Sequence, residues 1–204
     1  MAAPARSNAR GAVTRARILA AAVDCLTEGG IDDVRIAKVA ERAATSSASV
    51  HYHFATRETL LAEAIEESFA VAGDVRTTTK YGAGGARERL RRKVEESLPL
   101  DPRRRREWEL WVELWLRAVR HSELRPTAAK LYARMHQWFG ETIAEGVESG
   151  EFTVADPGRT IDRLLALIDG YGIRALTDDP AMPIERAREE IWVAVAADLG
   201  VAEG

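Results

Sequence analysis

Apolar residues recur at intervals of three and four along almost the whole chain, which is the spacing of one face of an α-helix. No stretch alternates apolar and polar positions strictly enough to predict a β-strand. The pattern therefore predicts an all-α protein. We expect about nine helices, over residues 12–28, 36–43, 47–53, 57–76, 86–97, 103–121, 126–149, 157–176 and 183–199.

Glycine, proline and threonine residues mark the ends of these predicted helices. The pair Gly29-Gly30 ends the first helix, and Thr56 is placed to cap the fourth. Gly150 is placed to form a left-handed cap after the seventh helix, with Phe152 folding back on it. Proline stands at or beside the start of four other helices, where a backbone N–H is not needed: Pro102, Pro126, Pro157 and Pro183.

Two short predicted helices, over residues 36–43 and 47–53, are joined by only three residues. Such a short joint forces an abrupt change of direction, and the small side chains of Ala40 and Ala43 let the two helices cross closely. This arrangement predicts a helix-turn-helix.

The second of these helices has an apolar inner face and a polar outer face. Val50 and Phe54 form the inner face. No acidic residue lies on the outer face, so it can approach the negatively charged DNA duplex. The outward residues are Ser47, Ala48, Ser49, His51, Tyr52 and His53.

This region resembles the DNA-binding domain of the TetR family of transcriptional repressors. The resemblance rests on a short recognition helix ending in the run HYHF (residues 51–54), followed by Arg57, Glu58 and Leu60. The resemblance implies an N-terminal DNA-binding domain and a C-terminal helical domain that binds a small organic effector and forms a homodimer. It also implies DNA contacts, from base edges to phosphates, for Arg35, Ser46, Ser47, Ala48, Ser49, His51, Tyr52, His53 and Arg57.

Three positions depart from the pattern of that family. Ala44 stands where the family usually has glycine, so this turn residue must avoid or tolerate a positive φ. His51 replaces the usual tyrosine and Arg57 the usual lysine. Because base-proximal positions are substituted, the operator cannot be read from the sequence.

The charge distribution suits this interpretation. The chain carries a net charge of −3, but residues 1–60 hold eight basic against six acidic side chains. A basic N-terminal part followed by an acidic remainder fits a small nucleic-acid contact surface. No apolar run approaches the length of a membrane helix, and no signal peptide is expected, so we expect a cytoplasmic protein.

Other kinds of chemistry find little support. Cys25 is the single cysteine and lies on an apolar face, and His51 and His53 diverge on a helix, so we expect no metal site. No Glu-x-x-His pair, phosphate loop or nucleophile elbow occurs. We therefore expect no enzyme and no cofactor. The basic run 103–106 is followed by glutamates, which indicates a solvated helix face.

Large aromatic side chains gather on the middle helices of the C-terminal part. They either fill a core or line a pocket for an apolar or cationic organic ligand. The candidate pocket residues are Trp108, Trp111, Trp115, Tyr132, His136, Phe139 and Tyr171. The segments 149–157 and 168–170 are similar to BetI-like members of the family, a choline-responsive branch.

The last two predicted helices carry apolar positions that fit either a two-fold dimer interface or the core of one protomer. These are Leu164, Ile168, Ile184, Ile191, Trp192 and Val195. We expect residues 1–56 to bind DNA, with residues 1–11 as a disordered arm, and residues 57–204 to sense a ligand and dimerise. The hypothesis is a repressor that a ligand releases from a palindromic double-stranded operator, and the alternative is a DNA-binding protein without an effector.

Overall fold

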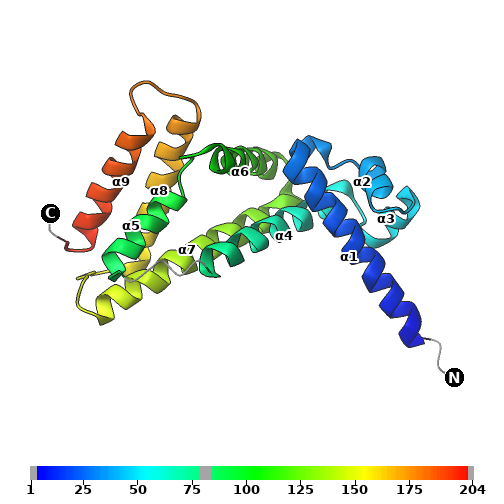
Figure 1. The fold of residues 1–204 in the computed structure, drawn as a ribbon, viewed down its shortest axis with the longest axis horizontal. Coiled ribbons are helices and arrows are strands. Elements are labelled where there is room, and N and C mark those ends of the chain that lie inside the picture. Colours follow the sequence, from blue (N-terminus) through cyan, green and yellow to red (C-terminus); the bar gives the residue numbers. More distant parts are fainter. Residues whose placement is uncertain (1–3, 79–83, 202–204) are drawn as a thin grey trace. The chain divides into compact units, whose positions relative to one another are not determined.

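A computed structural model describes the backbone of residues 4–78 and 84–201, and the side chains of residues 11–68 and 84–201. Within these ranges the fold is all-α, as predicted, and contains no strand (Figure 1). The helices are α1 (Pro4–Gly29), η1 (Ile31–Asp33), α2 (Ile36–Arg42), α3 (Ser47–His53), α4 (Arg57–Thr78), α5 (Ala86–Glu96), α6 (Pro102–Arg120), η2 (Ser122–Leu124), α7 (Arg125–Glu148), α8 (Pro157–Leu176) and α9 (Ile184–Asp198).

The predicted helix ends agree closely with the structure at most positions. The Thr56 hydroxyl accepts a hydrogen bond from the Thr59 N–H at 3.0 Å and caps α4. Gly150 takes a φ of 76°, and the Phe152 N–H bonds to the Gly146 carbonyl at 3.0 Å, so the expected left-handed cap of α7 is confirmed.

The N-terminal helix differs from the expectation. It begins at Pro4 and not at residue 12, so residues 4–11 are helical where we expected an arm. Proline is well suited to the first helical turn, and the alanines that follow favour helix. The two 3-10 helices, η1 and η2, were also not predicted, because three residues are too few to show a period.

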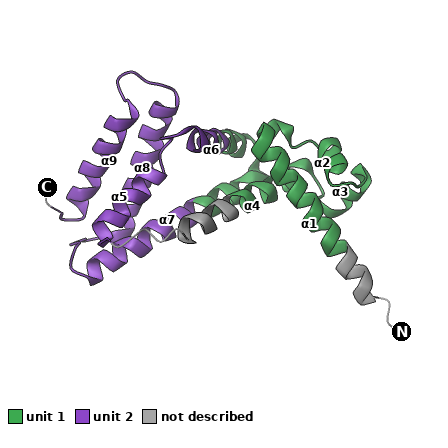
Figure 2. Ribbon diagram, in the orientation of Figure 1, with its two compact units in different colours: residues 1–79, 113–131 green, residues 80–112, 132–204 purple. Residues whose placement is uncertain are grey.

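The chain forms two compact units (Figure 2). Unit 1 comprises residues 1–79 and 113–131, and unit 2 comprises residues 80–112 and 132–204. The helix-turn-helix therefore shares a unit with α4, η2 and parts of α6 and α7. The buried core of unit 1 includes Ile18, Leu26, Ile31, Val39, Val50, Phe54, Leu60, Leu61 and Leu124.

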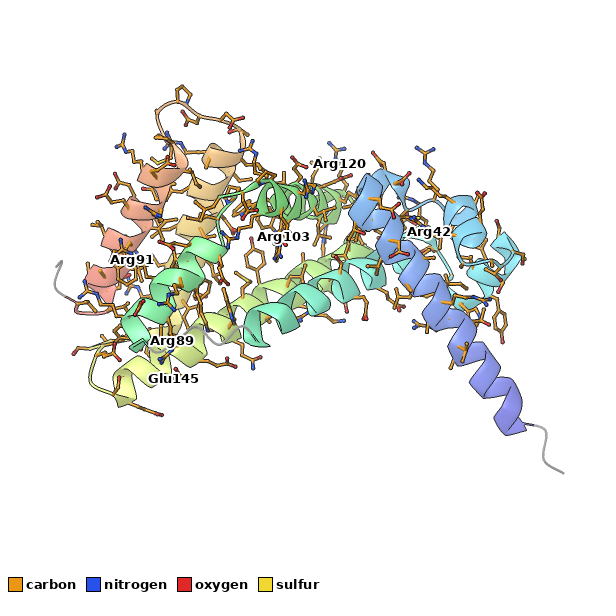
Figure 3. The ribbon with its side chains drawn as sticks, viewed as in Figure 1. Arg42, Arg89, Arg91, Arg103, Arg120 and Glu145 are labelled. Carbon is orange, nitrogen blue, oxygen red and sulfur yellow. The ribbon has the colours of Figure 1, made fainter. Side chains whose placement is uncertain are left out.

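Unit 2 contains the rest of the helices around its own core. The indole of Trp108 donates to the Ser97 carbonyl at 3.0 Å, and its ring lies against Gly172 of α8. Lys93 is buried and donates its amine to the Trp138 carbonyl, and burial lowers the pKa of Lys93. On the surface, Arg89 of α5 pairs with Glu145 of α7 at 2.5 Å (Figure 3).

None of the helices in the described part of the chain is long and apolar enough to cross a membrane. In residues 11–68 and 84–201, no group of His, Cys, Asp or Glu side chains is arranged to hold a metal ion.

Candidate functional site

The turn between α2 and α3 has the abrupt geometry that the sequence predicts. Ala44 takes a positive φ of 46°, so it adopts the left-handed conformation at the position where the family usually has glycine. The Thr45 N–H bonds back to the Ala40 carbonyl at 2.9 Å and closes the turn. The Ser46 hydroxyl then accepts from the Ser49 N–H at 3.1 Å and caps α3.

Helix α3 presents the expected outer face. Val50 and Phe54 are buried, which fixes the rotation of the helix. Tyr52 is 85% exposed, and its ring makes an edge contact with the His53 ring at 5.0 Å. The other residues that we expected to face DNA from this helix are exposed or half-buried: Ser47, Ala48, Ser49 and His51.

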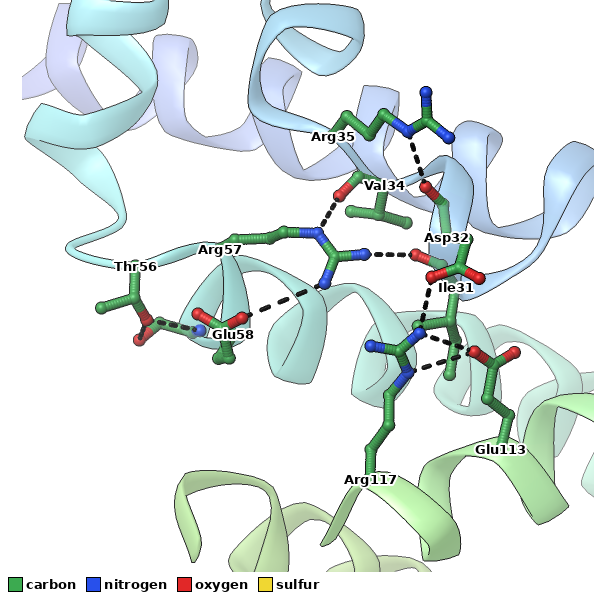
Figure 4. Close-up of polar contacts among 10 residues, drawn as sticks. Ile31, Asp32, Val34, Arg35, Thr56, Arg57, Glu58, Glu113 and Arg117 are labelled. Carbon is green, nitrogen blue, oxygen red and sulfur yellow. Dashed lines mark hydrogen bonds and ion pairs between the residues drawn. The ribbon is translucent and has the colours of Figure 1, made fainter. Parts of the chain in front are cut away.

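Arg57, for which the family resemblance implies a phosphate contact, makes two hydrogen bonds to the backbone of unit 1. Its Nε donates to the Val34 carbonyl at 2.8 Å, and its Nη2 donates to the Ile31 carbonyl at 2.8 Å (Figure 4). These two donors hold the segment around η1. Arg35 is exposed and donates its Nε to the Asp32 carbonyl at 3.0 Å.

A groove of about 430 Å³ opens between α7 and α8 in unit 2. It is lined by Tyr132, Ala133, His136, Asp162, Leu165, Ala166 and Asp169. The Tyr132 hydroxyl donates to Asp169 Oδ2 at 2.6 Å. Burial, reinforced by this hydrogen bond, raises the pKa of Tyr132, so the phenol keeps its proton. Burial also raises the pKa of Asp169, and the bond from Tyr132 partly offsets that effect.

The predicted pocket residues do not all lie at the groove. Tyr132 and His136 line the groove, and Trp111 places its ring 6.3 Å from the Tyr132 ring. Trp108 and Phe139 are buried in the core of unit 2. Two half-buried residues, Trp115 of unit 1 and Tyr171 of α8, lie outside the set that lines the groove.

Sequence reasoning missed the two carboxylates of the groove. Asp169 is the hydrogen-bond partner of Tyr132, and Asp162 lies 3.7 Å from Nε2 of His136. Asp169 left a signal in the sequence, because it interrupts an otherwise apolar stretch of α8 and belongs to the segment 168–170 that resembles BetI-like proteins.

The apolar residues of α8 and α9 that we considered for a dimer interface lie mostly inside the protomer. Leu164, Ile168, Ile191 and Val195 are buried within unit 2, where α8 packs against α9. Of the two possibilities left open by the sequence, these four residues therefore belong to the core of one protomer. Ile184 and Trp192 keep part of their surface accessible.

A helix-turn-helix with an acid-free outer face, carried on one chain with a helical unit that contains a polar groove, defines the class of one-component transcriptional regulators. Residues 18–64 match the family described as "Bacterial regulatory proteins, tetR family", and residues 86–199 match "BetI-type transcriptional repressor, C-terminal". The chain belongs to the TetR family of transcriptional regulators and carries a BetI-type C-terminal domain. It is thus a DNA-binding regulator and not an enzyme, as the sequence predicted.

Several known proteins are similar to this chain over most of their length. A transcriptional regulator from Saccharomonospora viridis, solved in complex with choline, is 33% identical with a TM-score of 0.70, covering 88% of this chain and 94% of its own. The multidrug-binding protein EbrR, solved with proflavin, is 27% identical with a TM-score of 0.64, and the similarity covers 89% of this chain and 99% of that one. HTH-type transcriptional regulator BetI 1 of Chromohalobacter salexigens is 20% identical over 182 residues, which are 87% of this chain and 86% of the relative.

Proposed function

We propose that this regulator binds a palindromic operator in the cytoplasm as a homodimer and is released from it by an organic cation. The observation that carries the proposal is the Tyr132–Asp169 pair in the groove of unit 2. A partly buried carboxylate beside aromatic rings favours a positively charged ligand, because the carboxylate attracts the charge and the rings add cation–π contact. Choline in the Saccharomonospora viridis relative supports the same class of ligand.

The DNA-binding residues keep their proposed roles, apart from Arg57. Ser47, Ala48, Ser49 and His51 would face base edges from α3, while the exposed side chains of Arg35 and Tyr52 and the half-buried side chain of His53 would contact phosphates. Ser46 would contribute by capping α3. In this proposal Arg57 positions the helix-turn-helix through the backbone carbonyls that it holds.

We propose a dimer because a single helix-turn-helix contacts only a few base pairs. Two copies related by a two-fold axis read a palindrome with half-sites about 34 Å or a multiple of that apart. The outer faces of α8 and α9 would make the contact. Trp192 is half-buried and Val193 is 44% exposed on α9, so this helix still offers apolar surface after the protomer core has formed.

The ligand proposal is tested by calorimetry on the full-length protein with choline and with its neutral isostere 3,3-dimethylbutan-1-ol. We expect choline to bind at least about tenfold more tightly than the isostere, because only choline carries the charge. Asp169→Asn should remove most of this preference. Asp162→Asn is the matched control, because Asp162 lies in the same groove but is 77% exposed, and its field is screened.

The release step is tested with an operator selected from random DNA. Choline should weaken operator binding by the wild-type protein, since an effector acts through its differential affinity for two arrangements. Equal binding of choline and its isostere would refute a cation site. Operator binding that no bound ligand changes would favour the alternative, a regulator without an effector.

A further inference from the structure

The short helix η1 determines where the helix-turn-helix begins. Only Gly30 separates it from α1, and only Val34 and Arg35 separate it from α2. Ile31 and Val34 are fully buried, so this segment is anchored in the core of unit 1. A displacement of η1 would therefore be passed on to α2, and through the closed turn to α3.

Two arginines from distant parts of the sequence hold this segment (Figure 4). Arg57, at the start of α4, binds the carbonyls of Ile31 and Val34. Arg117 of α6 donates its Nη2 to Asp32 Oδ1 at 2.6 Å. All of these residues belong to unit 1.

Glu113 orients the guanidinium of Arg117. It lies one turn earlier on α6, and its Oε1 accepts from Arg117 Nε at 3.1 Å and from Nη2 at 2.8 Å. The side chain of Arg117 is only 23% exposed, whereas that of Asp32 is 79% exposed. The arginine is thus fixed on α6, and η1 is attached to it through Asp32.

We propose that Arg117 is a positioning residue for operator binding, which holds η1, and through it α2 and α3, in the DNA-binding arrangement. The inference goes beyond the proposed function, because it needs neither an effector nor a dimer.

Charge alone and positioning predict opposite results for one substitution. Asp32→Asn removes a negative charge close to the DNA-binding helices, and by electrostatics alone this should strengthen binding to DNA. If the Arg117–Asp32 contact positions the helix-turn-helix, the same substitution weakens binding.

The test measures operator affinity of the full-length protein by fluorescence anisotropy, without effector. We expect Arg117→Gln and Asp32→Asn each to weaken binding about fivefold, and the double variant to be no weaker than the poorer single one. The matched control is Arg120→Gln, on the same helix, whose side chain is exposed and forms no ion pair with the residues described (Figure 3). It should stay within about twofold of the wild type.

Two further measurements separate positioning from folding and from direct contact with DNA. Melting temperatures should change little, since an ion pair with an exposed partner adds little stability, and the salt dependence of binding should stay unchanged because no phosphate contact is lost. Amide exchange in residues 36–42 should be faster in Arg117→Gln than in Arg120→Gln. Stronger operator binding by Asp32→Asn, additive losses in the double variant, or unchanged amide exchange would each overturn the proposal.

Discussion

The Tyr132 hydroxyl donates a 2.6 Å hydrogen bond to Asp169, which joins α7 to α8 at the wall of the groove. Because the phenol keeps its proton, it is a donor throughout the neutral range, and Asp169 is its acceptor. A carboxylate that burial desolvates is costly for the folded state. Such a cost is typical of residues that are retained for a function and not for stability.

We predict that Asp169→Asn stabilises the protein at neutral pH. Burial raises the pKa of Asp169 in the folded state, so the native protein binds its proton more tightly than the unfolded chain does. The favourable contribution is therefore present at acidic pH and is lost as the pH rises through the folded-state pKa. The variant has no such group, so its advantage over the wild type should grow as the pH rises above the ordinary carboxyl pKa of about 4.

Thermal melts of the two proteins at a series of pH values measure the effect. Asp162→Asn, at an exposed position of the same helix, should show a difference from the wild type that does not vary in this way. A constant offset for Asp169→Asn would show that the carboxylate is not desolvated.

A second prediction concerns the contact between Trp108 and Gly172. A Cβ at residue 172 would lie 2.2 Å from the Trp108 ring, and this ring is buried. We expect Gly172→Ala to lower the free energy of unfolding by about 1–3 kcal/mol. Gly170→Ala, on the same helix with nothing within 4 Å, should instead raise it by up to about 1 kcal/mol. Urea titrations measure the free energy of unfolding of both variants. Equal changes from the wild type in the two variants would contradict this prediction.

The turn of the helix-turn-helix gives a third prediction. Ala44 takes a left-handed conformation that costs an L-residue about 1–2 kcal/mol, whereas glycine adopts it freely but loses more chain entropy on folding. Ala44→Gly should therefore raise the free energy of unfolding by about 0.5–1 kcal/mol. Ala37→Gly, at an exposed position inside α2, should lower it by a similar amount. Equal destabilisation by the two substitutions would exclude the left-handed turn.

The fourth prediction separates two roles of Arg57. Its two bonds to backbone carbonyls should make Arg57→Ala less stable by about 1.5–3 kcal/mol and weaken operator binding. Because these donors face η1, the slope of log affinity against log salt should stay as in the wild type. Arg35→Ala should lower this slope by about one. If the slope fell by the same amount in Arg57→Ala, Arg57 would be assigned a phosphate contact.

The parts of the fold that could be predicted from the sequence are those that local physics specifies. The period of Val50 and Phe54 fixed the rotation of α3, and the three-residue joint fixed the turn. Gly150 and Phe152 were predicted as a cap because both ends of that motif lie within a few residues of each other. Each of these features depends on neighbours along the chain.

The parts that could not be predicted depend on contacts between segments that are far apart in the sequence. Periodicity shows that Leu164 and Val195 belong to an apolar face, but it does not distinguish a core from an interface between two copies. It likewise could not separate Trp108, which packs on Gly172, from Trp111, which lies beside Tyr132. The carbonyls held by Arg57 belong to a segment more than twenty residues away, and nothing in the local sequence connects them.

The make-up of unit 1 determines how this regulator could be recombined with others. Residues 113–131 belong to the same compact unit as the helix-turn-helix, and they reach it through Arg117–Asp32 and through the bonds that Thr127 and Lys130 make to Glu66. A chimera that takes only the first fifty-odd residues would cut across a shared core. A transplantable DNA-binding unit must carry these later residues with it, so hybrid sensors built on this protein need three junctions along the chain, at 79/80, 112/113 and 131/132, and not one.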